Sequence, residues 1–338
     1  MIKLRVHLKE DSYSIHIKKG ILNAVSSFCL SYSKILLVTD SGVPKQYIDI
    51  VKKEIPHCLL FTLKKGEKNK NMQSVNAILH QLSINNFDRH DLILAIGGGV
   101  VLDLCAFVAS IYKRGMHYGS IPTTVLAQVD SCTGGKNGIN YDSFKNGVGT
   151  FYHPKFVLID PLVLDTLPKR HWNNGLIEAL KMGLIHDKNL FDLIATKNIK
   201  KNIQSIIYHS LKNKIDIIEQ DVHDIGIRQI LNYGHTLGHA IESYCNFKVL
   251  HGEAVAYGMV LETKQNEIKE QLLQIYQKIH LKKIKPIPLT LLKPYIMQDK
   301  KRVHQSIIIP QINQIGSCQL VEISMNVFFK QMGDEIHE

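Results

Sequence analysis

The sequence lacks an apolar run long enough to cross a membrane. Its strongest apolar segments, such as CLLFTL (58–63) and KILLVTD (34–40), fall well short of the roughly 20 residues that span a bilayer. It also shows no secretory signal, because MIKLRVHLKEDSYSIHI (1–17) is charged and alternates like a β-strand. We therefore expect a cytoplasmic protein that does not bind membranes.

The cysteines of the chain follow no motif. Six cysteines are scattered without any C-x-x-C spacing, which argues against a disulfide framework and against a cysteine zinc site. We expect reduced thiols, most of them in the core.

Aromatic residues are few, at 7% with a single tryptophan, whereas basic residues are in excess. Lys and Arg number 41 against 30 Asp and Glu, and the resulting net charge of +11 favours an anionic partner. Such a partner is a phosphorylated or carboxylated metabolite, or nucleic acid. Nucleic-acid binding would need cations interleaved with aromatics on an exposed face, so we expect a small-molecule partner and no nucleic acid.

The residue pattern of the 338-residue chain changes near residue 160. The first 160 residues alternate short β-type runs, such as DLILAI (91–96) and FVLID (156–160), with helical ones, which predicts a mostly parallel sheet covered by helices. From Trp172 to about Ile279 the apolar spacing is mostly helical. The sequence therefore predicts an α/β chain with a sheet domain at 1–160 and a mainly helical domain at 161–338.

A glycine-rich turn follows one buried strand. In DLILAIGGGVVLDL (91–104), three glycines separate the strand from a helix, an arrangement that lets a pyrophosphate approach a helix N-terminus. It is not a G-x-G-x-x-G motif, because Leu102 occupies the last glycine position. Asp40, Glu67 and Lys70 are further candidates for this site, and an ordinary loop is the alternative for each.

The segment 121–154 is dense in glycine and polar residues. Gly134-Gly135-Lys136 resembles a phosphate cradle but lacks the spacing of a P-loop. Asp130, Lys136, Lys145 and Asn146 are plausible site residues on loops, and each taken singly is also compatible with a solvated surface.

Three histidines occur within LNYGHTLGHAIESYCNFKVLHGEAV (231–255), each beside a glycine. His235 and His239 are four residues apart, so on a helix they share one face. This spacing suits metal ligands and structural packing alike, and the pair alone does not decide between them.

The order of these segments resembles the 3-dehydroquinate synthase family of sugar-phosphate cyclases. The segments that carry the resemblance run from Glu67 to Lys301 and are GEKNK, IGGGVVLDL, YKRG, PTTVLAQVDSCTGGKNGIN, KNGVG, DPLVLDTLPKR, NNGLIEALKMG, LNYGHTLGHAIE, HGEAVAYGM and DKK. Leu102 and Ala106 stand where that family has smaller residues, and His171 stands where it has glutamate.

The resemblance implies a role for many single residues. The metal, zinc or cobalt, would be bound by Glu178, His235 and His251, with His239 beside it as a substrate residue. The other substrate positions are Lys136, Asn146, Lys181, Lys214, Arg228 and Asn232, and Lys300 or Lys301 of the DKK segment would supply a further cation. Arg114 would reach the phosphate in a neighbouring subunit of a homodimer. The NAD positions are Asp40, Glu67, Lys70, Gly98, Gly99, Val100, Asp103, Thr123, Thr124, Asp130, Ser131, Lys136, Lys145, Thr166 and Leu167.

The resemblance also implies a reaction. A seven-carbon sugar phosphate acid is oxidised transiently with NAD, loses phosphate, is reduced again and closes to a carbocycle by an aldol step. The glycines beside the histidines would let the backbone approach the metal. The alternatives are another sugar-phosphate cyclase, or a metal-dependent polyol dehydrogenase that shares the strand, the glycines and the metal but not the cationic residues.

Overall fold

The computed structural model describes residues 1–9, 11–142, 144–246, 248–297, 302–303 and 306–333. The chain divides into two compact units, Met1–Pro168 and Lys169–Glu338. None of the described helices combines the length and apolar character that a bilayer crossing requires.

The first unit is built on a sheet that has seven strands among the described residues, in the order β1-β2-β9-β6-β5-β3-β4. β1 pairs antiparallel with β2, and every other pair is parallel, which confirms the predicted α/β fold. The strands are β1 (Ile2–Val6), β2 (Tyr13–Ile17), β3 (Ile35–Asp40), β4 (Leu59–Leu63), β5 (Leu92–Gly97), β6 (His117–Pro122) and β9 (Phe156–Ile159).

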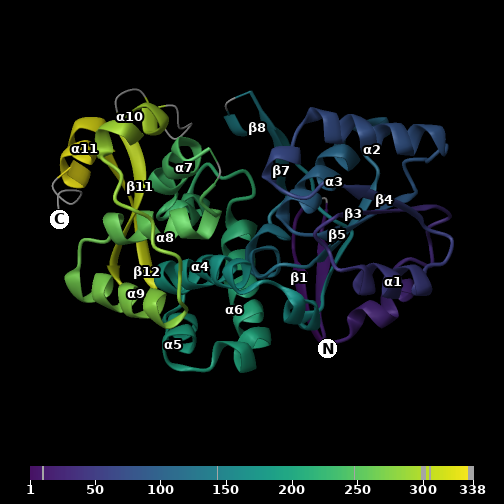
Figure 1. Cartoon of the computed structure of the whole chain (residues 1–338), viewed down its shortest axis with the longest axis horizontal. Coiled ribbons are helices and arrows are strands. Elements are labelled where there is room, and N and C mark those ends of the chain that lie inside the picture. The colour runs from purple at the N-terminus through teal and green to yellow at the C-terminus, as the bar shows by residue number, and fades with distance from the viewer. Residues whose placement is uncertain (10, 143, 247, 298–301, 304–305, 334–338) are drawn as a thin grey trace. The chain divides into compact units, whose positions relative to one another are not determined.

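Helices cover both faces of this sheet. Figure 1 shows α1 (Lys45–Glu54) on one side of strands β3 to β5, and α2 (Met72–Ile84) and α3 (Gly99–Ile111) on the other. The central strands are continuous apolar runs because both of their faces are buried; Leu92 to Ile96 of β5 are all fully buried. The short helices are η1 (Ile21–Phe28), η2 (Glu67–Asn69), η3 (Tyr112–Arg114), η4 (Ala127–Ser131) and η5 (Pro161–Thr166).

An antiparallel hairpin of β7 (Lys136–Tyr141) and β8 (Phe144–Phe151) also belongs to the first unit. It is separate from the large sheet and packs on α3. The sequence analysis did not predict this hairpin.

The second unit is mainly helical, as predicted. Its helices are α4 (Lys169–His186), α5 (Lys188–Thr196), α6 (Ile199–Gln220), η6 (Ile227–Asn232), α7 (His235–Tyr244), α8 (His251–Glu262), α9 (Asn266–Lys278), α10 (Leu289–Met297) and α11 (Met325–Gly333). It also contains an unpredicted antiparallel sheet of β10 (Arg302–Val303), β11 (Ser306–Gln314) and β12 (Ser317–Ser324).

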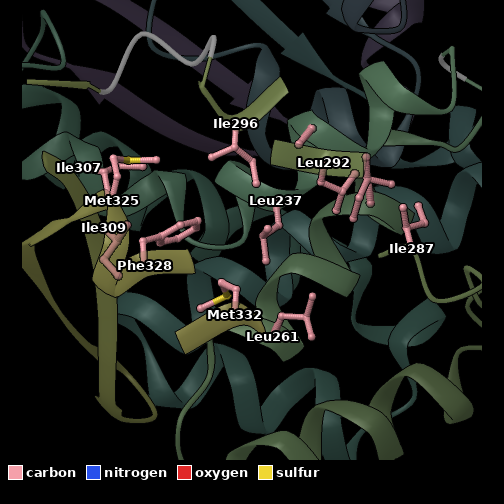
Figure 2. Packing of buried hydrophobic residues seen from close by; sticks show 13 residues of the cluster. Leu237, Leu261, Ile287, Leu292, Ile296, Ile307, Ile309, Met325, Phe328 and Met332 are labelled. Carbon is pink, nitrogen blue, oxygen red and sulfur yellow. The ribbon is translucent and has the colours of Figure 1, made fainter. Parts of the chain in front are cut away.

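A hydrophobic cluster fixes the face on which α7 presents its polar residues. Leu237 and Ile241 of α7 pack with residues from α8, α10, α11 and β11, and Figure 2 shows these side chains gathered between the elements. Since this side of α7 is committed to the core, His235 and His239 lie on another face of the helix. The hydrophobic packing of the unit thus orients the histidine motif.

The six cysteines all fall within the described residues and are free thiols, four of them buried, which agrees with the expectation of reduced core thiols. The larger residues at Leu102 and Ala106 are accommodated in the first unit, because both side chains are buried on α3.

Candidate active site

Three helices of the second unit bring Glu178, His235 and His251 together. Glu178 lies within α4, whereas His235 and His251 are the first residues of α7 and α8. Glu178 Oε1 is 3.7 Å from His235 Nε2 and 3.6 Å from His251 Nε2. One donor atom from each of the three residues lies within 4.8 Å of the other two, which is the geometry of a group that could hold a metal ion.

The glycines beside the histidines serve close helix packing. A Cβ atom on Gly252 would lie 2.0 Å from Asn174 O, and one on Gly234 would lie 2.5 Å from Met259 Cγ. Gly234 also has a left-handed backbone, with φ of 75°, at the residue before α7. These glycines let α8 lie directly against α4 and α7. This role differs from the predicted one, in which they let the backbone approach the metal.

Each of the two histidine rings is held through its other nitrogen. His235 Nδ1 is 3.0 Å from Tyr233 O, and His251 Nδ1 is 3.0 Å from Glu242 Oε2. A carbonyl or carboxylate oxygen accepts a hydrogen bond, so both Nδ1 atoms carry the proton and both Nε2 lone pairs remain available. Metal-binding histidines are oriented in this way.

Sequence reasoning did not find Glu242. It follows His235 by seven residues and His239 by three, a spacing that places it on their helix face and that could have suggested a shared site.

The electrostatics of the cluster suit a cation. Burial raises the pKa of the Glu178 carboxyl, but Lys181 and the two histidines outweigh it and hold this pKa well below its usual range. Burial and Lys181 together hold the pKa of His235 well below its ordinary value, so its imidazole is neutral at pH 7. Among the described residues, none forms a hydrogen bond with the buried Glu178 Oε1. A buried carboxylate oxygen that faces the Nε2 atoms of two histidines fits a divalent metal.

His239 lies beside this cluster. Its ring centroid is 5.2 Å from that of His235 and 5.9 Å from that of His251. His239, Glu242 and His251 form a second group close enough to hold a metal, in which Glu242 faces the Nδ1 atom of His251. The assignment of His239 to substrate, not to metal, stays a prediction.

Several predicted substrate residues of the second unit surround η6, against which α4 and α6 both pack. Lys181 Nζ is 2.5 Å from Glu178 Oε2 and donates to Leu231 O at 2.6 Å, next to Asn232 at the end of η6. Lys214 is buried on α6. Lys181 thus lies beside the Glu178 carboxylate, and the substrate role of Lys214 stays a prediction.

Arg228 is almost fully buried within η6 and donates to Val222 O at 2.6 Å. Its loop is organised by Asp221, whose carboxylate accepts hydrogen bonds from the backbone amides of Ile225, Gly226 and Arg228. Burial raises the pKa of Asp221, but these amides outweigh it and hold the pKa below its usual range.

In the first unit, predicted NAD residues meet at the carboxyl ends of neighbouring parallel strands. Asp40 ends β3, the glycines follow β5, and Thr123 and Thr124 follow β6. A Cβ on Gly98 would be 3.2 Å from Thr124 Cγ2, and one on Gly99 would be 3.3 Å from Ser131 Oγ. The crevice at this sheet edge is where open α/β sheets bind ligands.

Other predicted NAD residues lie around this edge. Val100 and Asp103 are on α3, Asp130 is in η4, and Thr166 ends η5 and donates to the Tyr47 hydroxyl at 3.2 Å. Leu167 directly follows η5.

Lys70 joins predicted cofactor and substrate positions. Its buried ammonium lies 2.5 Å from Asp103 Oδ2 and donates to Asn146 Oδ1 at 2.5 Å. Asn146 has a left-handed φ of 51° and receives further support from Asn140, whose side chain also donates to Glu67 Oε1 at 2.9 Å. These contacts link the hairpin to the loop that contains Glu67.

The remaining predicted residues are more exposed or lie elsewhere. Lys136 begins β7 after a turn in which Gly134 and Gly135 have positive φ, and Lys145 is on β8. Arg114 is exposed in a turn where Lys113, Arg114 and Gly115 all have positive φ, a strained backbone for the two non-glycine residues. Lys300 and Lys301 lie outside the described residues.

Solved structures of two cyclases share this fold over nearly the whole chain, and a butanol dehydrogenase of Thermotoga maritima shares it less closely, with a TM-score of 0.61. The 2-epi-5-epi-valiolone synthase of Streptomyces hygroscopicus, solved with NAD+ and Zn2+ bound, is 25% identical with a TM-score of 0.88, and the match covers 98% of each chain. A 2-deoxy-scyllo-inosose synthase solved with carbaglucose-6-phosphate, NAD+ and Co2+ has a TM-score of 0.86 and 22% identity, over 98% of this chain and 100% of that one.

Sequence comparison identifies the family within this class. The family models for the 3-dehydroquinate synthase N-terminal and C-terminal regions match residues 60–174 and 175–302. The 3-dehydroquinate synthase of Streptococcus thermophilus is 39% identical over 98% of this chain and 100% of its own length. The chain belongs to the 3-dehydroquinate synthase family.

Proposed function

We propose that the protein converts 3-deoxy-D-arabino-heptulosonate 7-phosphate to 3-dehydroquinate and phosphate, a phosphorus-oxygen lyase reaction of the shikimate pathway that supplies aromatic amino acid biosynthesis. The observation that carries this proposal is the match to 3-dehydroquinate synthases along nearly the whole chain, with both family regions present in order. The Glu178, His235 and His251 cluster supplies a site of the required kind.

The second unit would hold the metal through Glu178 Oε1 and the Nε2 atoms of His235 and His251. Glu178 Oε2 is already paired with Lys181, which favours binding through one carboxylate oxygen. Zinc or cobalt bound there would polarise a substrate hydroxyl or carbonyl oxygen. Two imidazoles and one carboxylate are a catalytic donor set, because they leave coordination positions for substrate.

The first unit would hold NAD at the carboxyl ends of β3, β5 and β6. Gly98 and Gly99 permit close approach at the start of α3, where free backbone amides favour a pyrophosphate. The chemistry supplied by bound NAD would be reversible oxidation of one ring carbon of the substrate. Asp40, Lys70 and Asp103 supply polar groups for the cofactor in this proposal.

The substrate carries a carboxylate and a phosphate, and the predicted substrate residues are correspondingly cationic. Arg228 offers a planar fork that matches a carboxylate, whereas Lys136, Lys181 and Lys214 offer movable point charges that suit phosphate. Arg114 would serve the phosphate in a neighbouring subunit. This cationic set favours a doubly anionic substrate over a neutral polyol, and so favours the proposed reaction over the dehydrogenase alternative.

Turnover of the substrate tests the proposed function. Purified protein should release phosphate from 3-deoxy-D-arabino-heptulosonate 7-phosphate when NAD is present, a metal chelator should stop the release, and added Zn2+ or Co2+ should restore it. Absence of phosphate release from the metal-loaded protein, or release that a chelator leaves unchanged, would contradict the proposal.

Lys181→Met is expected to weaken substrate capture while the metal is retained. A hydrogen bond to a charged group contributes about 1.5–3 kcal/mol, so kcat/KM should fall about 10- to 100-fold. An ammonium 2.5 Å from the Glu178 carboxylate opposes a bound dication, so its removal should leave zinc affinity equal or higher. Zinc content and steady-state kinetics measure the two effects.

The matched control is Lys188→Met, which removes another lysine paired with a carboxylate, that of Asp192 at 2.6 Å on the exposed side of α5. This variant should change neither property. Loss of zinc in Lys181→Met in proportion to activity would show that Lys181 acts as a structural partner of Glu178 instead.

A further inference from the structure

His251 lies between two buried carboxylates. Its Nε2 atom faces Glu178 Oε1 at 3.6 Å, and its Nδ1 atom faces Glu242 Oε2 at 3.0 Å. The Glu242 side chain is 4% exposed and that of His251 is 22% exposed. The two faces of one imidazole therefore have different partners at different distances.

We propose that Glu242 is a positioning residue for the metal site: it accepts the Nδ1 proton of His251, fixes the ring, and so directs Nε2 toward the metal. The distance of 3.0 Å is that of a hydrogen bond, whereas the 3.6 Å on the Nε2 side leaves a gap that a metal between the two donors would bridge. A carboxylate that accepts from Nδ1 also makes the imidazole a stronger donor at Nε2. The inference rests on the metal site of the proposed function.

The two helices that contain Glu242 and His251 pack closely against each other. α7 and α8 pack so closely that a Cβ on Gly238 would lie 3.2 Å from Val255 Cα. At the other end of α8, the Tyr233 hydroxyl pairs with Thr263 Oγ1 at 2.6 Å, and Glu262 accepts from the Gly234 amide at 2.7 Å. These contacts fix the start of α7 relative to α8.

Glu242 and the Tyr233 carbonyl each accept the Nδ1 hydrogen bond of one histidine ring, Glu242 that of His251 and Tyr233 that of His235. The His251 ring is the more exposed of the two, at 22% against 11% for His235, so it has more freedom to turn. A charged acceptor forms the stronger hydrogen bond, and it is placed where the ring needs more restraint.

The hydrogen bond between His251 Nδ1 and Glu242 also prevents a metal from binding at Nδ1. His239, Glu242 and His251 form a second group with metal-binding dimensions, and within it Glu242 faces the Nδ1 edge of His251. While Nδ1 carries a proton that Glu242 accepts, this edge has no lone pair for a metal. Glu242 thereby selects one of two neighbouring metal positions.

The test compares Glu242→Ala, Glu242→Gln and the matched control Asp187→Asn. Asp187 is a carboxylate 3.6 Å from the Nδ1 atom of another histidine, His209, and Asn keeps the oxygen that caps α5, so this variant removes only a carboxylate charge beside a histidine. The measurements are the Zn2+ dissociation constant by competition with a chelator, and the visible spectrum of the Co2+-substituted protein.

We expect Glu242→Ala to weaken Zn2+ binding by roughly 10- to 100-fold, the usual effect of losing an outer partner of a metal ligand. Glu242→Gln keeps an acceptor oxygen and nearly the same shape, so it should stay folded and recover part of the affinity. The Co2+ spectrum of both should retain the intensity of the wild-type site, since the ligand set is unchanged. Asp187→Asn should match the wild type in both measurements.

Wild-type Zn2+ affinity in Glu242→Ala would overturn the positioning role. A Glu242→Ala spectrum that changes as completely as that of Glu178→Ala would show that Glu242 binds the metal directly and would overturn it too. Failure of the wild-type protein to bind Zn2+ or Co2+ would instead contradict the metal site itself, so the two failures are distinguishable.

Discussion

Purified protein should contain about one zinc per chain, and His235→Ala or His251→Ala should lose the metal and with it the release of phosphate. Each substitution removes one of two nitrogen donors that face Glu178 Oε1 and leaves a buried carboxylate oxygen without its counter-ion. The loss of affinity should exceed the roughly 100-fold that an outer partner costs at most. Metal analysis after dialysis, together with the phosphate assay, measures both effects.

His239→Ala is the matched control for this prediction, because it removes a third imidazole whose centroid is only 5.2 Å from that of His235. It should keep the metal and lose activity through weaker substrate binding. If His239→Ala lost zinc as fully as His235→Ala, the ligand assignment would be wrong, and the second group, which contains His239 and Glu242, would be the metal site.

Phosphate released by the protein should greatly exceed the NADH that accumulates. A dehydrogenase produces one NADH per turnover, whereas a cyclase oxidises and then reduces the same carbon and leaves no net NADH. The transient ketone acidifies the neighbouring C–H bond, which makes elimination of phosphate accessible. Lysine and arginine side chains that hold the leaving phosphate favour this elimination over premature reduction.

The sheet of the first unit could be predicted because its strands are apolar on both faces. Leu92 to Ile96 form a continuous buried run that ends in glycine, and such a run between helical segments indicates a parallel strand. The β7–β8 hairpin gave no such signal. Its strands contain Lys136, Asn137, Gly138 and Asn140 and are held by pairing with each other and by packing on α3.

A helix boundary in the second unit is set by one N-cap residue, which the apolar spacing does not reveal. The segment 173–195 has helical spacing throughout, yet Asp187 ends one helix and begins the next, since its side chain accepts from the amides of Asn189 and Leu190. The antiparallel strands β11 and β12 were missed, because they lie outside the helical motifs of the sequence and their main partner is each other.

The metal-type cluster followed from the family resemblance, and its geometry from tertiary packing. Spacing alone placed His235 and His239 on one face but could not show that Glu178 and His251 would approach His235 from two other helices. Glu242 was missed for the same reason, because its partner belongs to α8 and only the close packing at Gly238 brings them together.

One measurement tests the proposed reaction most directly: phosphate release and absorbance at the NADH wavelength followed together in one sample, with 3-deoxy-D-arabino-heptulosonate 7-phosphate in large excess over enzyme and NAD stoichiometric with enzyme. The proposal predicts many phosphates released per NAD while the NADH absorbance stays near its starting level. Absorbance that rises one-for-one with substrate consumed, or activity only on glycerol-like polyols, would contradict the cyclase and support the dehydrogenase.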